Sequence, residues 1–315
     1  MLLWTFDGKI RFIKAVSNVH HMRKTATFPF LKNSVFTGIF KVFLLPFLFV
    51  RYAGILVKTK SYLCIPNVDL VLTTKCTLRC KDCSNLMPYY KDSISYSPEE
   101  LIKDLDALLA SVDYIFEVRI LGGEPFVYPQ LDNIISKCLA ERKIEKIRII
   151  TNGTLLPTDD CMVLLRKLKP RQKKKILFSI SSYAVVADSV KNKLYGRLKN
   201  MGYCFYIRDI RVWNDYGLFN KREYSTKDLS INYSTCSLCV TLFNHEISIC
   251  ARAANGTFLG LIPKIETEQV KLNSYGPEQV RRELKALFGK KFISTCDYCD
   301  HLKDIEIPAA IQGKI

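Results

Sequence analysis

Residues 74–83 read TKCTLRCKDC and contain three closely spaced cysteines, Cys76, Cys80 and Cys83. They directly follow an apolar segment, residues 68–73 (VDLVLT), that predicts a strand. A loop of this length can bring three thiolates together, so the spacing suits one [4Fe–4S] cluster. Three ligands leave one iron free to bind a small molecule through an amine and a carboxylate. A structural zinc site is the alternative, but zinc needs a fourth ligand, and only Asp82 and Asp92 lie nearby.

Short apolar segments alternate with amphipathic segments from residue 68 onward. Strands are predicted over residues 68–73, 114–121, 146–151, 176–181 and 203–208. Helices are predicted over residues 131–139, 161–168 and 189–200, and from Pro98 onward, where Ser97 and Glu100 form a capping box. This βα repetition predicts an α/β fold with a parallel sheet, either barrel-like or open, whose ligands bind at the carboxyl ends of the strands.

Polar and glycine-rich motifs follow the next predicted strands. Residues 121–125 read LGGEP, in which two glycines allow a ligand to approach the backbone closely and Glu124 offers an anion for an ammonium group. Residues 151–154 read TNGT, and residues 178–182 read FSISS. These motifs would all lie at the same edge of a parallel sheet.

The cysteine spacing and the G-G-E motif one βα unit downstream resemble the radical S-adenosylmethionine superfamily, over about residues 67–208. The resemblance implies that Cys76, Cys80 and Cys83 bind the cluster that holds S-adenosylmethionine. It also implies a set of residues that contact this cofactor, with the G-G-E motif meeting its methionyl amine. That set is Gly122, Gly123, Glu124, Pro125, Asn152, Ser179 and Ser181.

The same resemblance implies a partial (β/α)6 TIM-like barrel and a characteristic chemistry. In this family the reduced cluster donates one electron to the sulfonium, and the resulting 5′-deoxyadenosyl radical abstracts a substrate hydrogen. A reductant of the flavodoxin or ferredoxin type is implied as a partner. Asp82 departs from the family, which most often has an aromatic or other bulky residue there, packed on the adenine.

A second group of cysteines follows the barrel: Cys236, Cys239, Cys250, Cys296 and Cys299. Their two C-x-x-C pairs suit a zinc site as well as a cluster. The pattern resembles auxiliary-cluster domains of the SPASM and twitch type, which implies an auxiliary [4Fe–4S] cluster, with zinc as the alternative. Four ligands suffice, so one cysteine is spare or substrate supplies a ligand. The other cysteines, Cys64, Cys138, Cys161 and Cys204, are predicted to lie in the core.

Three parts of the chain are predicted: a leader over residues 1–62, the barrel over 63–225, and a small cysteine-rich domain over 226–315. In the leader, residues 35–57 are strongly apolar, but Lys41, Pro46 and Arg51 interrupt them. They predict either a buried helix packed on the barrel or a segment lying on a membrane surface. A true membrane span is a third, less favoured reading, because a span needs roughly 20 apolar residues with few charges. Ligand-like cysteine spacing and the lack of a signal-peptide pattern predict a cytoplasmic protein, in the second case at the inner face of the membrane.

The net charge of +17 raises acidic substrates, anionic membrane and nucleic acid as partners. The densest basic stretch, residues 167–175 (KLKPRQKKK), predicts a solvated loop. It has no interleaved aromatic residues of the kind that bind single-stranded nucleic acid, so nucleic acid is disfavoured.

The substrate is expected to be a small molecule, a glycan or a peptide. Residues 242–263 resemble proteins associated with bacterial surface-polysaccharide gene clusters, which favours oxidation or epimerisation of a sugar-like substrate. A peptide-modifying enzyme and a non-catalytic metal-binding adaptor are the alternatives. Asp215, His245 and Arg252 are candidates for acid–base chemistry on the substrate.

Overall fold

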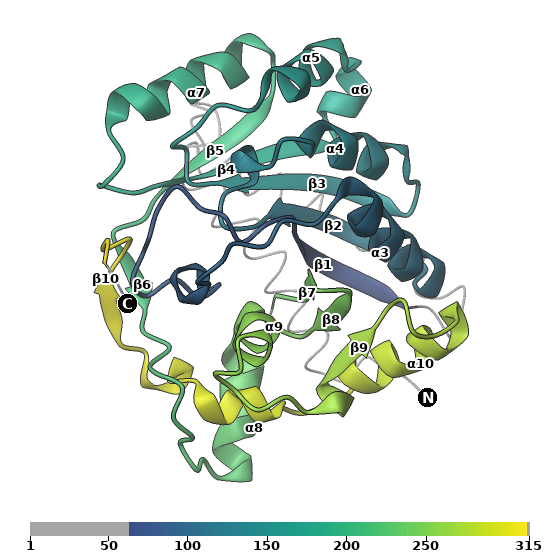
Figure 1. Ribbon diagram of the computed structural model, residues 1–315, viewed down its shortest axis with the longest axis vertical. Helices are drawn as coiled ribbons and strands as arrows, with labels where there is room; N and C mark the ends of the chain where they lie inside the picture. Colours follow the sequence, from purple (N-terminus) through teal and green to yellow (C-terminus); the bar gives the residue numbers. More distant parts are fainter. Residues whose placement is uncertain (1–62, 238, 314–315) are drawn as a thin grey trace, which may run out of the picture.

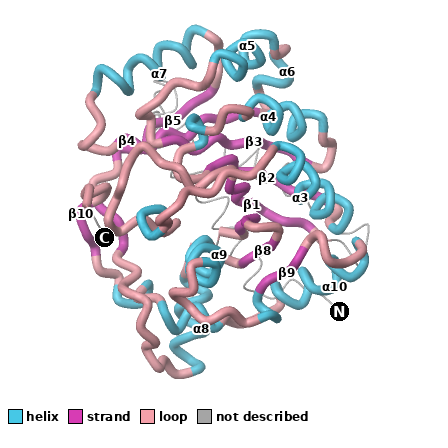
Figure 2. Tube along the Cα trace, viewed as in Figure 1, coloured by secondary structure: helices cyan, strands magenta, loops and turns pink. Residues whose placement is uncertain are grey.

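An eight-stranded sheet runs through the part of the chain that the computed structural model describes, residues 63–237 and 239–313 (Figure 1). The strand order is β5-β4-β3-β2-β1-β7-β8-β9. Neighbours from β5 to β7 are parallel, whereas β8 and β9 are antiparallel additions. Figure 2 distinguishes the strands, in magenta, from the helices, in cyan. The strands are β1 (Cys64–Val71), β2 (Tyr114–Leu121), β3 (Ile144–Thr151), β4 (Ile176–Ser182), β5 (Cys204–Asp209), β7 (Thr241–Phe243), β8 (Glu246–Ser248) and β9 (Gln269–Lys271).

Helices connect the parallel strands and cover the outer side of the curved sheet (Figure 1). The helices are α3 (Pro98–Ser111), α4 (Leu131–Ala140), α5 (Asp159–Lys167), α6 (Pro170–Lys173), α7 (Asp188–Asn200), α8 (Thr226–Thr235), α9 (Ala251–Phe258) and α10 (Pro277–Phe288). Short 3-10 helices are η2 (Met87–Tyr89), η3 (Pro125–Val127), η4 (Glu266–Glu268), η5 (Ser294–Tyr298) and η6 (His301–Lys303). A separate ribbon pairs β6 (Val212–Asn214) with β10 (Glu306–Pro308). The predicted α/β fold with a parallel sheet is confirmed, and it is that of a partial TIM-like barrel.

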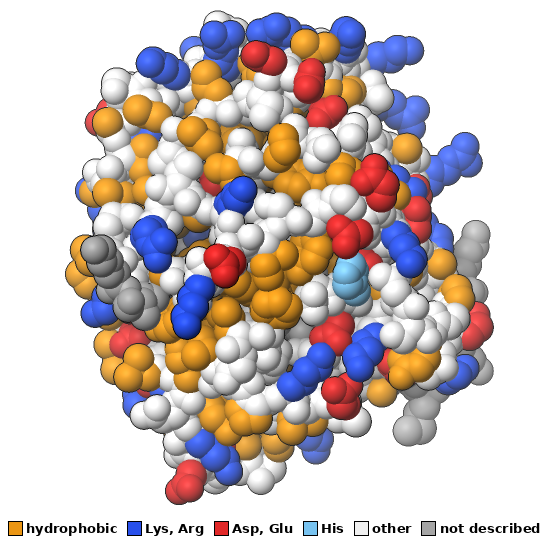
Figure 3. All heavy atoms as spheres, in the orientation of Figure 1, with side chains coloured by type: hydrophobic (Ala, Val, Ile, Leu, Met, Phe, Trp, Pro, Cys, Tyr) orange, Lys and Arg blue, Asp and Glu red, His pale blue; other side chains and the backbone are white. Residues whose placement is uncertain are grey.

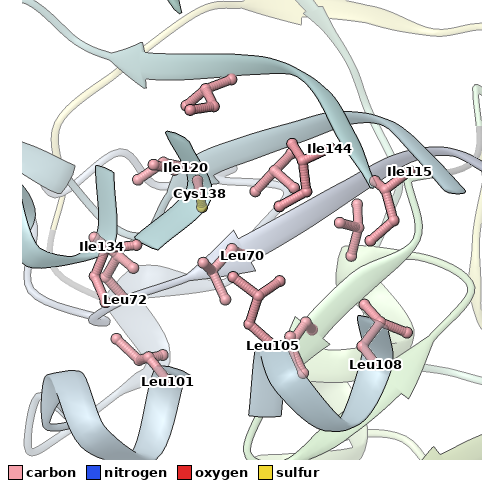
Figure 4. Packing of buried hydrophobic residues seen from close by; sticks show 14 of the residues in the cluster. Leu70, Leu72, Leu101, Leu105, Leu108, Ile115, Ile120, Ile134, Cys138 and Ile144 are labelled. Carbon is pink, nitrogen blue, oxygen red and sulfur yellow. The ribbon is translucent and has the colours of Figure 1, made fainter. Parts of the chain in front are cut away.

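Helix α3 shows how the sequence pattern becomes core. Its capping box forms as predicted, because Ser97 Oγ accepts a hydrogen bond from Glu100 N (3.2 Å) and Glu100 Oε2 accepts one from Ser97 N (2.8 Å). Leucines at helical spacing then face the sheet, where Leu105 and Leu108 lie against Leu70 and its neighbours (Figure 4). Burial of each such side chain contributes roughly 1.5–3 kcal/mol.

Several local expectations were wrong. Residues 170–173 form helix α6 rather than a loop, since Pro170 occupies the first turn, where a missing N–H is harmless. Lys and Arg side chains gather along the upper rim of the molecule (Figure 3).

Two of the four cysteines predicted to lie in the core are exposed. Cys64 and Cys204 are exposed, because each begins its strand at the end of the sheet away from the core, whereas Cys138 and Cys161 are buried as predicted.

The carboxyl-terminal part of the chain continues the same sheet. Strand β7 pairs in parallel with β1, with Asp69 opposite Thr241 and Leu70 opposite Leu242. The division near residue 225 falls before α8 and stays a prediction. The leader, including residues 35–57, lies outside the described residues, and within them no helix is long and apolar enough to cross a membrane.

The inner face of the strands carries charge. Asp69, Arg119 and Arg148 lie side by side in register on β1, β2 and β3. Arg119 forms an ion pair with Asp69, and Arg148 Nη2 lies 2.7 Å from Glu117 Oε1. Arg148 also donates a hydrogen bond to the Tyr206 hydroxyl on β5 (2.7 Å). Apolar side chains therefore face the helices, while a polar floor faces the other way.

The residues that follow β1 (73–75) stay in close contact with the residues that follow β2 (122–124). Gly123 N donates to Thr73 O (2.8 Å), and Glu124 N donates to Lys75 O (2.9 Å). A Cβ at Gly122 would lie 2.4 Å from Thr73 O, and one at Gly123 only 2.2 Å from Lys75 O. Both positions therefore require glycine, because backbone occupies the space of a side chain.

Gly123→Ala is expected to lower the free energy of unfolding by ~1–3 kcal/mol or more, since its methyl group forces the two segments apart. The measurement is chemical unfolding of the metal-free protein. Gly196→Ala is the control, because Gly196 is exposed in α7 with no atom within 4 Å of the new Cβ. It should raise stability by roughly 0.5–1 kcal/mol. Equal stability of Gly123→Ala and the wild type would contradict the tight contact.

Candidate functional site

One cavity of about 960 Å³ opens at the carboxyl ends of the parallel strands. Its walls come from the loops after β1, β2, β3, β4 and β5 on one side and from residues 232–252 and 293–299 on the other. Both groups of cysteines line it: Cys76, Cys80, Cys83, Cys236, Cys239, Cys250, Cys296 and Cys299. The structure thus brings together two sets of thiols that are at least about 150 residues apart in sequence.

The first cysteine loop is fixed at both ends. At its start the hydroxyls of Thr73 and Ser95 are 2.6 Å apart, and Thr74 N donates to Ile94 O (2.8 Å). At its end Leu86, in the left-handed region with φ 56°, donates from its N–H to Cys83 O (2.8 Å). The thiols therefore lie on a short loop whose path is set by backbone hydrogen bonds.

Burial raises the pKa of all three thiols in this loop, that of Cys76 to about 12. Two polar side chains reach the sulfurs: Asn152 Nδ2 lies 3.6 Å from Cys76 Sγ, and Gln312 Nε2 lies 3.3 Å from Cys80 Sγ. A protonated thiol is a poor ligand, so metal binding here would release protons. The three sulfurs facing one cavity, with N–H donors beside two of them, fit a thiolate-bound cluster.

Glu124 is fully buried and ties the end of β2 to the end of β3. Its Oε1 accepts from Thr151 Oγ1 (2.7 Å) and Phe126 N (3.1 Å), and its Oε2 accepts from Asn152 N (2.8 Å). Burial raises its pKa to about 7. The carboxylate is not part of the cavity wall, and nor is Pro125, whereas Gly122, Gly123 and Asn152 are.

The two serines of β4 have different surroundings. Ser181 lies in the cavity wall beside Tyr183, whose ring packs edge-on against Trp213 with centroids 5.6 Å apart. Ser179 lies two residues earlier on β4 and is buried. Its Oγ makes no hydrogen bond within the described part of the chain. Asp82, which departs from the family pattern, is exposed at the rim.

The second set of cysteines is held by two helices. At the end of α8, Asn232 Nδ2 donates to Cys296 O (2.9 Å) and Cys299 O (3.3 Å). Cys250 begins α9, and its Sγ accepts from Ala253 N (3.3 Å). Burial raises the pKa of each thiol, that of Cys250 to about 12. Among the described residues, no three His, Cys, Asp or Glu side chains are arranged to hold a single metal ion.

Of the three acid–base candidates, only Arg252 lines the cavity. It donates to Gly217 O (2.7 Å) and Leu218 O (2.8 Å), and so fixes the loop after β6. Asp215 Oδ1 accepts from Gly217 N (2.7 Å) in a local turn. His245 lies in the turn between β7 and β8 with Nδ1 2.9 Å from Asp104 Oδ2, outside the cavity wall.

Sequence reasoning missed the polar floor of the cavity, formed by Asp69, Arg119, Arg148 and Tyr206. A signal was available, because Arg119 and Arg148 stand inside otherwise apolar strands, YIFEVRIL and IEKIRIIT. A charged residue within a buried strand costs free energy unless it is paired, and so marks a polar interior. The contact of Gln312 with Cys80 could not be expected from any pattern in the sequence.

Comparison with known proteins places the first cysteine loop and its neighbours within one family. Residues 70–194 match the Radical SAM superfamily. Curated relatives are enzymes named GTP 3′,8-cyclase. The one from Clostridium acetobutylicum is 30% identical over 139 residues, 42% of this chain and 39% of the relative. The one from Stenotrophomonas maltophilia (strain R551-3) is 37% identical over 95 residues, 29% of this chain and 28% of the relative.

The chain thus spans well under half the length of these curated relatives. A solved structure, native anSMEcpe with bound AdoMet, is 11% identical, with a TM-score of 0.46 over 75% of this chain and 82% of that chain. The sequence match over residues 70–194 contains the three-cysteine loop, the G-G-E motif and the end of β3. The chain therefore carries a Radical SAM superfamily domain.

Proposed function

We propose that this chain is a radical S-adenosylmethionine enzyme that abstracts a hydrogen atom from a substrate held in the cavity. The observation that carries the proposal is the convergence of Cys76, Cys80 and Cys83 with the Gly122–Gly123 backbone on that cavity. When bound, a [4Fe–4S] cluster on these thiols would supply the electron that cleaves S-adenosylmethionine to a 5′-deoxyadenosyl radical.

The residues expected to bind S-adenosylmethionine fall into two groups. Some contact the cofactor, and the others hold the contacting residues in position. Gly122, Gly123, Asn152 and Ser181 line the cavity, so they are proposed to contact S-adenosylmethionine. Pro125 and Ser179 are buried and are not part of that wall. They and Glu124 are proposed to act by holding the strand ends in place.

The second set of thiols is proposed to hold an auxiliary [4Fe–4S] cluster rather than zinc. Its cysteines face the first set across a cavity of about 960 Å³, near the upper end of the roughly 300–1,000 Å³ of ligand pockets. Such a volume leaves room for a substrate beside the cofactor. A flavodoxin or ferredoxin is the proposed source of electrons.

A sugar-like substrate that is oxidised or epimerised is supported by the polar floor. Arg119, Arg148 and Asp69 offer fixed donors and an acceptor in a site partly shielded from water. Such groups suit a molecule with several hydroxyl or acidic groups, because each buried polar group needs a partner.

A second candidate function is cyclisation of a purine nucleotide. It is favoured by the relatives that are named GTP 3′,8-cyclase. The arginines of the floor would suit phosphate as well as a sugar acid.

The proposed cluster ligands are tested by replacing Cys76, Cys80 and Cys83 one at a time with alanine. Each variant, reconstituted anaerobically, should lose about four irons per chain and form no 5′-deoxyadenosine from S-adenosylmethionine. Cys204→Ala is the matched control, because Cys204 is exposed at the start of β5. Full iron content and activity in the triad variants would remove the basis of the proposal.

Glu124→Ala tests the positioning role. Loss of the carboxylate leaves Thr151 Oγ1, Asn152 N and Phe126 N without an acceptor, at about 1–3 kcal/mol each. Binding of S-adenosylmethionine, measured by calorimetry, should weaken sharply, whereas an adaptor without this cofactor would bind none in either form.

Glu124 also predicts a pH dependence of stability. Burial raises its folded-state pKa from 4.5 to about 7, so its contribution is full below about pH 4.5 and is lost as the pH rises through 7. Over this pH range Glu124 changes the free energy of unfolding by about 3 kcal/mol. Glu124→Gln should remove this pH dependence. The measurement is urea unfolding of both proteins between pH 4.5 and 8. A profile unchanged by the substitution would assign the dependence to other groups.

Parallel assays with GTP and with nucleotide-linked sugars distinguish the two candidate functions. The reduced, reconstituted enzyme is incubated with S-adenosylmethionine and each compound, and products are identified by mass spectrometry and NMR. A sugar altered at one carbon supports the first function. A cyclised nucleotide supports the second and overturns the first.

A further inference from the structure

Residues 309–313 form a strap that runs from strand β10 to the first cysteine loop. Strand β10 pairs with β6, and Ala309 N extends this pairing by donating to Arg211 O (2.9 Å). The chain then turns at Ala310, which is buried and lies in the left-handed region with φ 58°. A residue other than glycine keeps this conformation where its surroundings impose it. The path of the strap is therefore set by the fold.

The strap pairs with the cysteine loop at Cys80. Cys80 and Gln312 are partners in an isolated antiparallel bridge. Backbone hydrogen bonds of 2.8 and 3.1 Å join the strap to residues 81 and 79, on either side of the bridge. Cys80 is itself buried. Backbone groups thus hold Gln312 opposite one of the three proposed cluster ligands.

The side-chain amide of Gln312 has a fixed orientation. Its Oε1 accepts from Arg79 N (2.7 Å), and its Nε2 donates to Ala310 O (2.8 Å). A reversed amide would set N–H against N–H and oxygen against oxygen, so these two hydrogen bonds determine which atom is the nitrogen. The same Nε2 lies 3.3 Å from Cys80 Sγ. Gln312 therefore presents an N–H donor to this sulfur.

This donor comes from a distant part of the chain. The sulfur of Cys76 has a donor within the loop itself, since Leu78 N lies 3.5 Å from Cys76 Sγ. Gln312, by contrast, is 232 residues away from Cys80 in sequence. Hydrogen bonds to the sulfurs are among the factors that set the reduction potential of an iron–sulfur cluster. Reduction makes the sulfurs more negative, so an N–H donor beside one of them stabilises the reduced form.

We propose that Gln312 is a positioning residue that acts through Cys80 and raises the reduction potential of the cluster bound by Cys76, Cys80 and Cys83. This inference rests on the proposed function. The amide favours the reduced state, which is the state that donates an electron to S-adenosylmethionine. It thereby brings the potential closer to that of a flavodoxin- or ferredoxin-type reductant. The strap keeps the donor in place through its pairing with residues 79–81.

The role is tested in the full-length, anaerobically reconstituted protein by redox titration followed by EPR. The signal of this cluster is identified by its change on addition of S-adenosylmethionine. Gln312→Ala removes the donor and should shift the midpoint potential to a more negative value. Ile311→Ala is the matched control, because the Ile311 side chain is exposed and the residue pairs with Lys81 through its backbone carbonyl. Equal potentials of Gln312→Ala and the wild type would overturn the role.

Gln312→Glu separates the amide donor from the geometry of the strap. A carboxylate can still accept from Arg79 N, but it replaces the N–H beside Cys80 Sγ with a negative oxygen. The potential should fall further than in Gln312→Ala, because a nearby anion opposes the added electron. A potential nearer to that of the wild type would assign the effect to the strap alone and refute the proposal.

A lower potential should also change the dependence on the reductant. With reduced flavodoxin, Gln312→Ala should form 5′-deoxyadenosine more slowly than the wild type, and the stronger reductant titanium(III) citrate should narrow this difference. An equal deficit with both reductants would contradict a redox role. A wild-type protein whose EPR signals do not respond to S-adenosylmethionine, and which forms no 5′-deoxyadenosine, would instead refute the proposed function itself.

Discussion

The contact between the Gly122–Gly123 backbone and residues 73–75 is the constraint on which the site depends. Strands β1 and β2 pair in parallel, and hydrogen bonds of 2.8 and 2.9 Å carry that pairing past the strand ends into the cysteine loop. Any side chain at either glycine would occupy the same space as backbone. The first cysteine, Cys76, is therefore positioned by the sheet itself rather than by a flexible loop.

The sheet positions the far wall of the cavity in the same way. Because β7 pairs with β1, the segment that carries Cys239 lies over Asp69 and Arg119. The two cysteine groups therefore face each other across charged side chains that are neutralised in pairs along the strands. Fixed dipoles and charges in such a partly enclosed space need no reorganisation when a polar substrate binds.

The elements predicted from periodic patterns agree with the structure. The contacts of isolated residues could not be predicted in the same way. The predicted strand over residues 114–121 is β2 to the residue, since apolar runs bounded by turns give a strong local signal. Strand β1 begins four residues earlier than its apolar run, because pairing of Cys64 with Tyr114 extends it. His245 and Asp215 carried no pattern beyond their residue type, and the structure gives them local contacts outside the cavity wall.

The sequence by itself determined the parallel α/β fold and the three-cysteine loop, because hydrophobic periodicity, capping and thiol spacing act over a few residues. Only the tertiary structure decided which distant groups meet. Gln312 reaches Cys80 across 232 residues, and Cys239 meets Arg119 through the pairing of β7 with β1. Such contacts depend on strand order and register, which no local pattern encodes.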